Sequence, residues 1–218
     1  MSARADASVS VGGCKRVAAL TLAVVCAFGA PDVFARKNYG SLFDAADSNV
    51  EDKRSFQVPA AGSIEVAFSP SEGAEALVIK VVDTAKTELR ILSYSFTSVP
   101  LVSALLRAKK RGVDVRLVAD EKNNVRDDRS GKGRAALSAL VNAGIAVRTI
   151  NVYPIHHDKV IIADRETVEL GSFNYSDAAA RRNSENVFVN WRNPKLAEVY
   201  IGHFERNFRQ ATAYQPQY

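Results

Sequence analysis

The chain has 218 residues, of which 47% are hydrophobic and 24% are charged, and its formal net charge is +5. This length and composition are those of a globular protein with a sizeable core, and they exclude a collagen-like repeat or a chain that is disordered throughout. The excess of basic residues is consistent with a polyanionic partner, either nucleic acid or anionic lipid.

The first 35 residues differ in kind from the rest. Lys15 and Arg16 precede an uncharged run from Val17 to Phe28, and small residues follow it. The run has 12 residues, whereas a membrane-spanning helix needs roughly 20. The pattern predicts a secretory signal peptide over 1–35 and no transmembrane segment in the mature chain. Both cysteines fall in this segment, so we expect a periplasmic or secreted bacterial enzyme without disulfides.

The remaining chain shows a loose lead-in over 36–61 and then regular elements over 62–218. Strands are expected over 64–68, 88–96, 113–120, 145–150 and 185–191, and helices over 72–86, 101–111, 134–143 and 193–211. Strands that alternate with helices of this length predict a single α/β domain with a mixed, mostly parallel sheet flanked by helices. The charged segment 121–133 fits either a solvated loop or a loop that contacts phosphate.

The segment 156–176, HHDKVIIADRETVELGSFNYS, concentrates polar side chains that suit phosphate chemistry. If it forms a hairpin with a two-residue turn at 165–166, directly opposed residues share one face of the sheet. Four polar side chains would then converge: His157, Lys159, Ser172 and Asn174. An imidazole can attack phosphorus or donate a proton, and the ammonium, hydroxyl and amide groups can hold phosphate oxygens.

Metal binding is a competing interpretation of the two adjacent histidines. In an extended strand His156 and His157 point to opposite faces, so they do not readily chelate one ion, and Lys159 would repel a cation. We therefore expect no metal and no other cofactor.

Six positions keep the spacing of a known motif, namely His157, Lys159, Asp164, Gly171, Ser172 and Asn174. This spacing resembles the HKD motif of the phospholipase D superfamily, with one copy in the chain. The sequence from about Ser63 to the C-terminus is also similar to the small bacterial Nuc-type endonucleases of that superfamily. The resemblance implies a single phospholipase D-like domain.

The resemblance also implies a role for each polar residue of the site. His157 would be the nucleophile that forms a phosphohistidine, or the general acid that protonates the leaving oxygen, depending on which copy of the motif attacks. Lys159, Ser172 and Asn174 would hold the phosphate. Glu185, eleven residues past the asparagine, would orient His157, because an acceptor on one imidazole nitrogen fixes the tautomer.

Other residues of the segment are expected to be structural. Asp164 stands at the start of the turn, where an aspartate commonly caps the local backbone, and Gly171 is taken as a structural member of the motif. His156 is expected to be a supporting residue on the other face, and His203 an ordinary surface or packing residue of the last helix. Core positions are expected for two aromatic residues, Phe173 and Tyr175.

One histidine cannot serve both sides of an in-line displacement at phosphorus, and the chain contains no second H-x-K. We therefore expect a homodimer whose two copies share one active site on the two-fold axis.

The leading hypothesis for function is a sequence-nonspecific, metal-independent endonuclease that acts on DNA, with RNA as a further candidate substrate. The alternative is a phospholipase D that acts on phosphatidylcholine or cardiolipin, which should show an exposed apolar patch beside the site. A third hypothesis, a module that binds nucleic acid without cutting it, is disfavoured because every polar position of the motif is intact.

Overall fold

The computed structural model describes residues 55–216. The predicted signal peptide, 1–35, and most of the predicted lead-in, 36–54, lie outside these residues. The described part begins with irregular chain over 55–62, and the first strand starts at Ser63. None of its helices is long and apolar enough to cross a bilayer.

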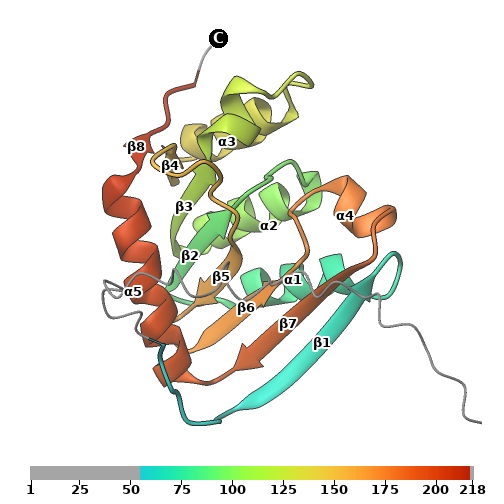
Figure 1. Ribbon diagram of the computed structural model, residues 1–218, viewed down its shortest axis with the longest axis vertical. Helices are drawn as coiled ribbons and strands as arrows, with labels where there is room; N and C mark the ends of the chain where they lie inside the picture. Colours follow the sequence, from blue (N-terminus) through green and yellow to red (C-terminus); the bar gives the residue numbers. More distant parts are fainter. Residues whose placement is uncertain (1–54, 217–218) are drawn as a thin grey trace, which may run out of the picture. The chain divides into compact units, whose positions relative to one another are not determined.

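One sheet organises the described residues, and its strand order is β1-β7-β6-β5-β2-β3-β4-β8 (Figure 1). The strands are β1 (Ser63–Ser69), β2 (Glu88–Ser93), β3 (Asp114–Asp120), β4 (Ala146–Ile150), β5 (Lys159–Ala163), β6 (Thr167–Gly171), β7 (Glu185–Trp191) and β8 (Thr212–Ala213). The helices are α1 (Ala74–Thr84), α2 (Val99–Lys110), η2 (Lys122–Arg126), α3 (Lys132–Asn142), α4 (Asp177–Arg181) and α5 (Pro194–Gln210). A single α/β domain with a mixed sheet flanked by helices is thus confirmed.

The prediction of a mostly parallel sheet is wrong. Only β2–β3 and β3–β4 pair in parallel, whereas the pairs β1–β7, β7–β6, β6–β5, β5–β2 and β4–β8 are antiparallel. The parallel pairs are the ones joined by helical crossovers. β5 and β6 are joined by a hairpin turn, and β6 and β7 by the segment 172–184, which contains the short helix α4; both connections join antiparallel neighbours.

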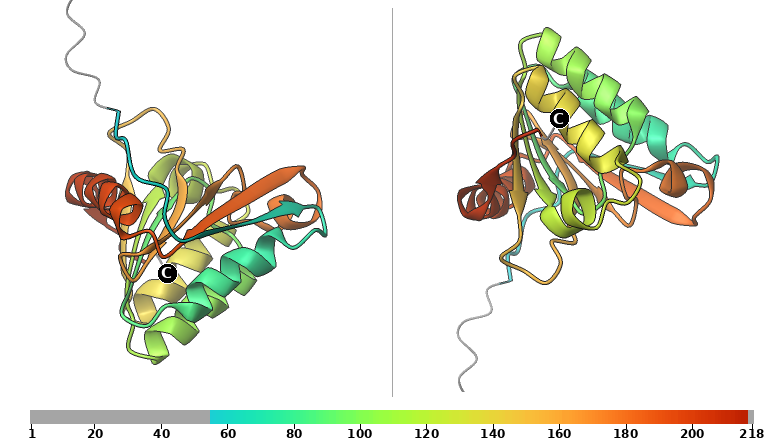
Figure 2. Two further views of the ribbon diagram at one scale, coloured as in Figure 1. Left: turned by 90° about the horizontal axis from the view of Figure 1, so that it is seen from below. Right: turned by 90° about the horizontal axis from the view of Figure 1, so that it is seen from above.

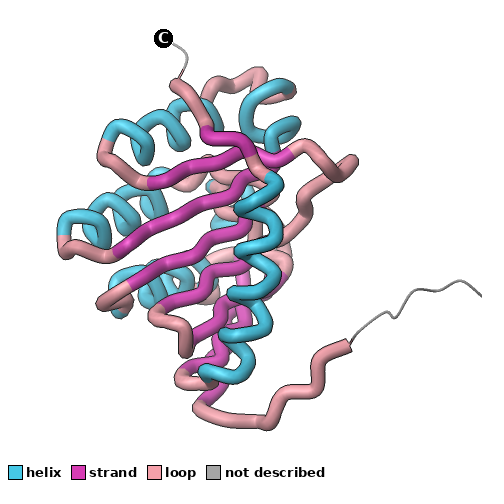
Figure 3. The backbone as a smooth tube through the Cα atoms, turned by 90° about the vertical axis from the view of Figure 1, so that its left-hand side faces the viewer, coloured by secondary structure: helices cyan, strands magenta, loops and turns pink. Residues whose placement is uncertain are grey.

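The two faces of the sheet are covered unequally. α1, α2 and α3 lie on one face, and α5 alone crosses the other (Figures 2 and 3). Along β2, Leu89 and Ile91 pack toward the three helices, whereas Leu92 packs toward α5. Because β5 is covered on both faces, its residues Val160–Ala163 are a continuous apolar run rather than an alternating one.

The start of α2 differs from the predicted helix by two residues. Ser98 accepts the backbone N–H of Leu101 with its hydroxyl oxygen at 3.2 Å, and Pro100 occupies the first turn. A serine cap followed by an early proline is a favourable helix start, so the helix begins at Val99 rather than at the predicted residue 101.

The edge strand β1 carries an apolar surface that none of the described helices covers. Ile64, Val66 and Phe68 alternate along the edge strand β1 and are 64%, 54% and 49% exposed. We call these three residues the β1 stripe. Their partners on β7 are Asn190, Phe188 and Asn186. Large apolar side chains in such a row are typical of an interaction surface.

Candidate active site

The predicted site residues come from the ends of neighbouring strands, which meet at one end of the sheet. β5 begins at Lys159, β6 ends at Gly171 and β7 begins at Glu185. Because β2–β5, β5–β6 and β6–β7 are antiparallel neighbours, the end of β2 at Ser93 lies at this same end of the sheet. Side chains far apart in the sequence are thereby brought to one place.

His157 is exposed, and Lys159 lies buried behind it. The Lys159 Nζ donates to the backbone carbonyl of His157 at 2.9 Å and lies 5.2 Å from the centre of the Tyr94 ring. The His157 imidazole packs against the same ring, with centroids 4.7 Å apart. Tyr94 thus supports both groups, leaving the imidazole open to a substrate and the ammonium close to it.

The positive charge of Lys159 is disfavoured by burial and favoured by two neighbouring carboxylates. Burial lowers the pKa of Lys159, while the negative charges of Asp158 and Glu185 raise it and offset part of the effect. An incoming phosphate would add negative charge and favour the ammonium further. The arrangement therefore suits an anionic ligand.

The predicted hairpin register is wrong by one residue. The turn has three residues, 164–166, rather than two, and the observed pairs include Val160 with Leu170 and Ala163 with Thr167. Asp164 and Arg165 both adopt positive φ, 52° and 55°. The extra residue moves Lys159 level with Gly171, so strand alternation alone does not place Ser172 on its face.

Ser172 lies near the candidate site because the chain leaves regular strand geometry at Gly171. A Cβ at Gly171 would lie 2.2 Å from the carbonyl oxygen of Asn186, so only glycine permits this approach of the end of β6 to β7. The Ser172 hydroxyl then donates to Glu185 Oε2 at 2.6 Å and accepts the backbone N–H of Asn186 at 3.1 Å. Gly171 is a structural member of the motif in this sense.

Glu185, whose implied role is to orient His157, is bonded to two other residues in the described chain. Its carboxylate accepts from Ser172 and, at 2.9 Å, from the amide of Asn183. Among residues 55–216 it makes no hydrogen bond with His157. Its negative charge acts on the neighbouring Lys159, where it raises the pKa of the ammonium and offsets part of the effect of burial.

Asn174 is held between two core aromatic residues. Phe173 and Tyr175 are 2% and 0% exposed, which confirms their predicted core positions. The side-chain carbonyl of Asn174 is buried and has no hydrogen-bond partner within the described residues. Because buried polar atoms are normally bonded, this amide keeps a hydrogen-bonding capacity that the fold itself does not use.

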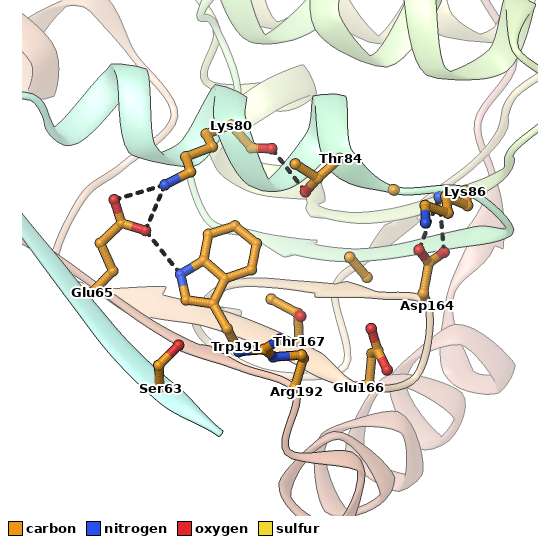
Figure 4. A pocket seen from close by; sticks show the side chains of 12 residues that line it. Ser63, Glu65, Lys80, Thr84, Lys86, Asp164, Glu166, Thr167, Trp191 and Arg192 are labelled. Atoms are coloured by element: carbon orange, nitrogen blue, oxygen red, sulfur yellow. Dashed lines mark hydrogen bonds and ion pairs between the residues drawn. The ribbon is translucent and has the colours of Figure 1, made fainter. Parts of the chain in front are cut away.

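Asp164, although part of the motif, lies at the opposite end of the sheet from His157. Its carboxylate accepts the backbone N–H groups of Lys86, Thr87 and Glu88 at 2.8, 2.7 and 3.0 Å. Burial opposes ionisation, but these bonds outweigh it and hold the pKa of Asp164 below its ordinary value. It borders a separate hollow of about 670 Å³, which Trp191 also lines (Figure 4). Asp164 therefore ties the β5–β6 turn to the start of β2.

A buried acid supports the loop that carries Asn174. Glu169, on β6, is completely buried, accepts the hydroxyl of Tyr175 at 2.8 Å with Oε2, and has no partner for Oε1 within the described chain. Burial raises the pKa of Glu169 to about 8. The carbonyl of Tyr175 accepts the N–H groups of Thr97 and Ser98 at 2.8 and 2.9 Å. Tyr175 thus links the loop to β6 and to the start of α2.

The raised pKa of Glu169 predicts how stability depends on pH. Between the ordinary value of 4.5 and about 8, the folded protein keeps a proton that the unfolded chain has lost. The free energy of unfolding should therefore fall as pH rises, by roughly 1.4 kcal/mol per pH unit. We expect Glu169→Gln to remove most of this slope in urea unfolding between pH 5 and 8. The exposed turn variant Glu166→Gln should keep it, and parallel curves for the wild type and Glu169→Gln would contradict the assignment.

Three residues beside the motif were not identified from the sequence, namely Tyr94, Asp158 and His203. The Asp158 carboxylate lies 2.9 Å from His203 Nε2 on α5, a polar contact that the expectation of an ordinary surface or packing residue for His203 does not include. Strand alternation around His157 sends Asp158 to the α5 face, which is a signal that could have found this pair.

The two adjacent histidines separate as expected. His156 is 3% exposed, whereas His157 is exposed. Within residues 55–216, no three His, Cys, Asp or Glu side chains gather as a group that could hold a metal ion.

A groove of about 1100 Å³ opens next to the site, between the first turns of α2 and α3 and the short helix α4. It reaches the site at Ser95, which follows Tyr94, and at Ser176, two residues past Asn174. Its basic side chains are Lys132, Arg181 and Arg182. Asp177 forms ion pairs with both arginines, whereas Lys132 has no acidic partner in the described chain.

Comparisons with known proteins agree with this geometry. The profile of the family described as cardiolipin synthase, PLD-like domain, matches residues 78–208. A phospholipase D from Rickettsia felis is 34% identical over 138 residues, which are 63% of this chain and 66% of that protein. The mitochondrial cardiolipin hydrolase of Danio rerio is 33% identical over 122 residues, 56% of this chain and 51% of that protein. The match therefore spans between half and two thirds of these relatives.

Solved structures give a fuller match. Nuc from Salmonella typhimurium, a phospholipase D family member, is 46% identical with a TM-score of 0.67, covering 70% of this chain and 98% of that one. NucT from Helicobacter pylori, at 21% identity and a TM-score of 0.60, covers 70% of this chain and 100% of that one, and shows the shared fold.

Proposed function

Because the chain belongs to the phospholipase D superfamily of phosphodiesterases, we propose that it is a metal-independent, sequence-nonspecific endonuclease that cleaves DNA, with RNA as a further substrate. The observation that carries the proposal is the exposed His157 backed by the buried ammonium of Lys159. The 46% identity to Nuc supports the nuclease among the possible activities.

The proposed chemistry proceeds in two displacements at phosphorus. A neutral His157 imidazole nitrogen attacks, the P–N bond forms, and the bond to the leaving oxygen breaks as a second His157 donates a proton to it. Water, deprotonated by that second imidazole, then attacks the phosphohistidine and restores the free enzyme. Lys159, Ser172 and Asn174 meet the charge on the phosphate oxygens through both steps.

The second histidine is proposed to come from another copy of the chain, in a homodimer with a shared active site. The β1 stripe supports this proposal, since it is apolar, is not covered by any described helix, and runs toward the site. In the register of β1 with β7, Phe68 pairs with Asn186 and Ser69 pairs with Glu185. Two copies joined through the same stripe would bring their active-site residues toward one two-fold axis.

Nucleic acid is favoured as the substrate by charge. The net charge of the chain is +5, and Lys132, Arg181 and Arg182 border the groove that opens from the site. Basic side chains along a path from the scissile phosphate would bind the flanking phosphates of a polymer, with no need to read its bases.

A phospholipase D remains the second candidate, because one observation favours it. Val152 and Ile155 are each 53% exposed in the connection between β4 and β5, just before the His156–His157 pair. Exposed aliphatic side chains beside a phosphate site are suited to a lipid surface. The names of the Rickettsia and zebrafish relatives point the same way.

Plasmid cleavage in the presence of excess EDTA tests the proposal. We expect conversion of supercoiled DNA to nicked and linear forms at an unchanged rate, with His157→Ala as the inactive control. Loss of cutting on chelation would overturn the metal-free mechanism. Intact plasmid together with hydrolysis of phosphatidylcholine or cardiolipin vesicles would replace the nuclease by the phospholipase.

We also propose that the enzyme acts in the periplasm or is secreted. This proposal rests on the sequence of residues 1–35 alone, which lie outside the described residues.

A further inference from the structure

The chain around His157 is pinned on both sides. The backbone N–H of His156 donates to Asp120 Oδ2 at 2.8 Å, at the end of β3. The backbone carbonyl of Asp158 accepts the N–H of Tyr94 at 2.8 Å. His157 is the residue between these anchors, so its position depends on how well its two neighbours are held.

The side chain of Asp158 is held by α5. Its Oδ2 lies 2.9 Å from His203 Nε2 and 3.5 Å from His156 Nδ1. Arg206 Nη2 lies 2.7 Å from the other ring nitrogen of His203, Nδ1. A guanidinium can only donate, so Nδ1 accepts and Nε2 carries the proton that bonds Asp158. The contacts thus form an ordered chain from Arg206 through His203 to Asp158.

The charges around Asp158 favour its ionised form. Burial would raise the pKa of Asp158, but the hydrogen bond from His203 and the positive charge of Lys159 hold it below the ordinary value. His156 is buried, which lowers its pKa and favours the neutral ring. Burial and the charge of Asp158 raise the pKa of Tyr200, which also faces it from α5. The negative charge of Asp158 in turn supports the ammonium of Lys159.

We propose that His203 is a positioning residue for catalysis: through its bond to Asp158 it fixes the segment that carries His157 and Lys159. His203 itself does not touch the substrate. Without its donor, the half-buried Asp158 carboxylate must find another partner, and the backbone on either side of it can shift. In-line attack tolerates little displacement of the nucleophile, so the chemical step should slow while binding of the diester changes little.

The test compares His203→Ala with His203→Gln, whose amide can still donate to Asp158. The inference rests on the proposal that His157 carries the chemistry, but not on which phosphodiester is cut, so rates are measured with DNA and with bis(4-nitrophenyl) phosphate. We expect His203→Ala to lower kcat by about 10- to 100-fold with KM changed by less than about 3-fold. His203→Gln should recover most of the loss. Glu198→Ala, an exposed change on the same helix, is the matched control.

A double-mutant cycle separates positioning from general destabilisation. Asp158→Ala, which removes the acceptor, should lower kcat to a similar extent, and adding His203→Ala to it should cause little further loss, because both changes break one contact. Additive losses, or His203→Ala at the wild-type rate with an unchanged melting temperature, would overturn the inference. Hydrolysis of the small diester without DNA cleavage would reject the nuclease while leaving this comparison intact.

Discussion

Replacing His157 by alanine is expected to lower the rate of hydrolysis of DNA and of small phosphodiesters by roughly 10³-fold or more, because it removes both the nucleophile and the general acid. The imidazole is exposed and packs against the Tyr94 ring, so the melting temperature should change little. Initial rates and thermal unfolding of the same preparations check this. Full activity of a folded variant would exclude His157 from the reaction.

The His157→Ala subunit should also inactivate the wild-type subunits with which it forms dimers. If one shared site needs two histidines, a mixed dimer is inactive. After subunit exchange in an equal mixture, activity should be about one quarter of that of wild type at the same total concentration, rather than about one half. A value of one half would show that each chain works alone. Ser184→Ala, an exposed change outside the motif, serves as the control for the mixing procedure.

Replacing Val66 by glutamate is the second prediction with a large expected effect. Val66 is the middle residue of the β1 stripe and is 54% exposed, so a charge there costs the isolated subunit little. In the proposed dimer the same charge would be buried without a partner, which disfavours association. We expect light scattering to show a monomer, and phosphodiester hydrolysis to fall about 10²-fold or more, because the second histidine is lost.

Val99→Glu provides a matched control for the oligomeric state, since Val99 is 73% exposed on another element, α2. It should remain a dimer. A Val66→Glu protein that is monomeric and fully active would contradict the shared site. One that stays dimeric would show that the copies associate through a different face.

Much of this architecture could be predicted from local pattern. The strands and helices around Gly112 and Gly144 lie within a few residues of their predicted bounds, because glycine ends a helix locally and apolar periodicity identifies buried faces. The mixed α/β fold follows from that alternation. The short helix α4 and the strand β8 were not predicted, since five- and two-residue elements carry little periodic signal.

The hairpin shows where such reasoning stops. Turn length was inferred from sequence, and the observed three-residue turn moved Lys159 level with Gly171. The register of a hairpin depends on the turn and on packing of both faces together. A turn containing non-glycine residues at positive φ, such as Asp164 and Arg165, is therefore hard to recognise in advance.

The sequence by itself determined the chemical inventory of the site: the spacing of His157, Lys159 and Asn174 within one motif, and the absence of a second H-x-K in the chain. Only the tertiary structure decided which of these groups act together. It brought Glu185 to Ser172, carried Asp164 to the far end of the sheet, and joined Asp158 to His203. Motif spacing is a local property of the chain, whereas these contacts depend on strand order and on which face α5 covers, which are set by packing of the whole sheet.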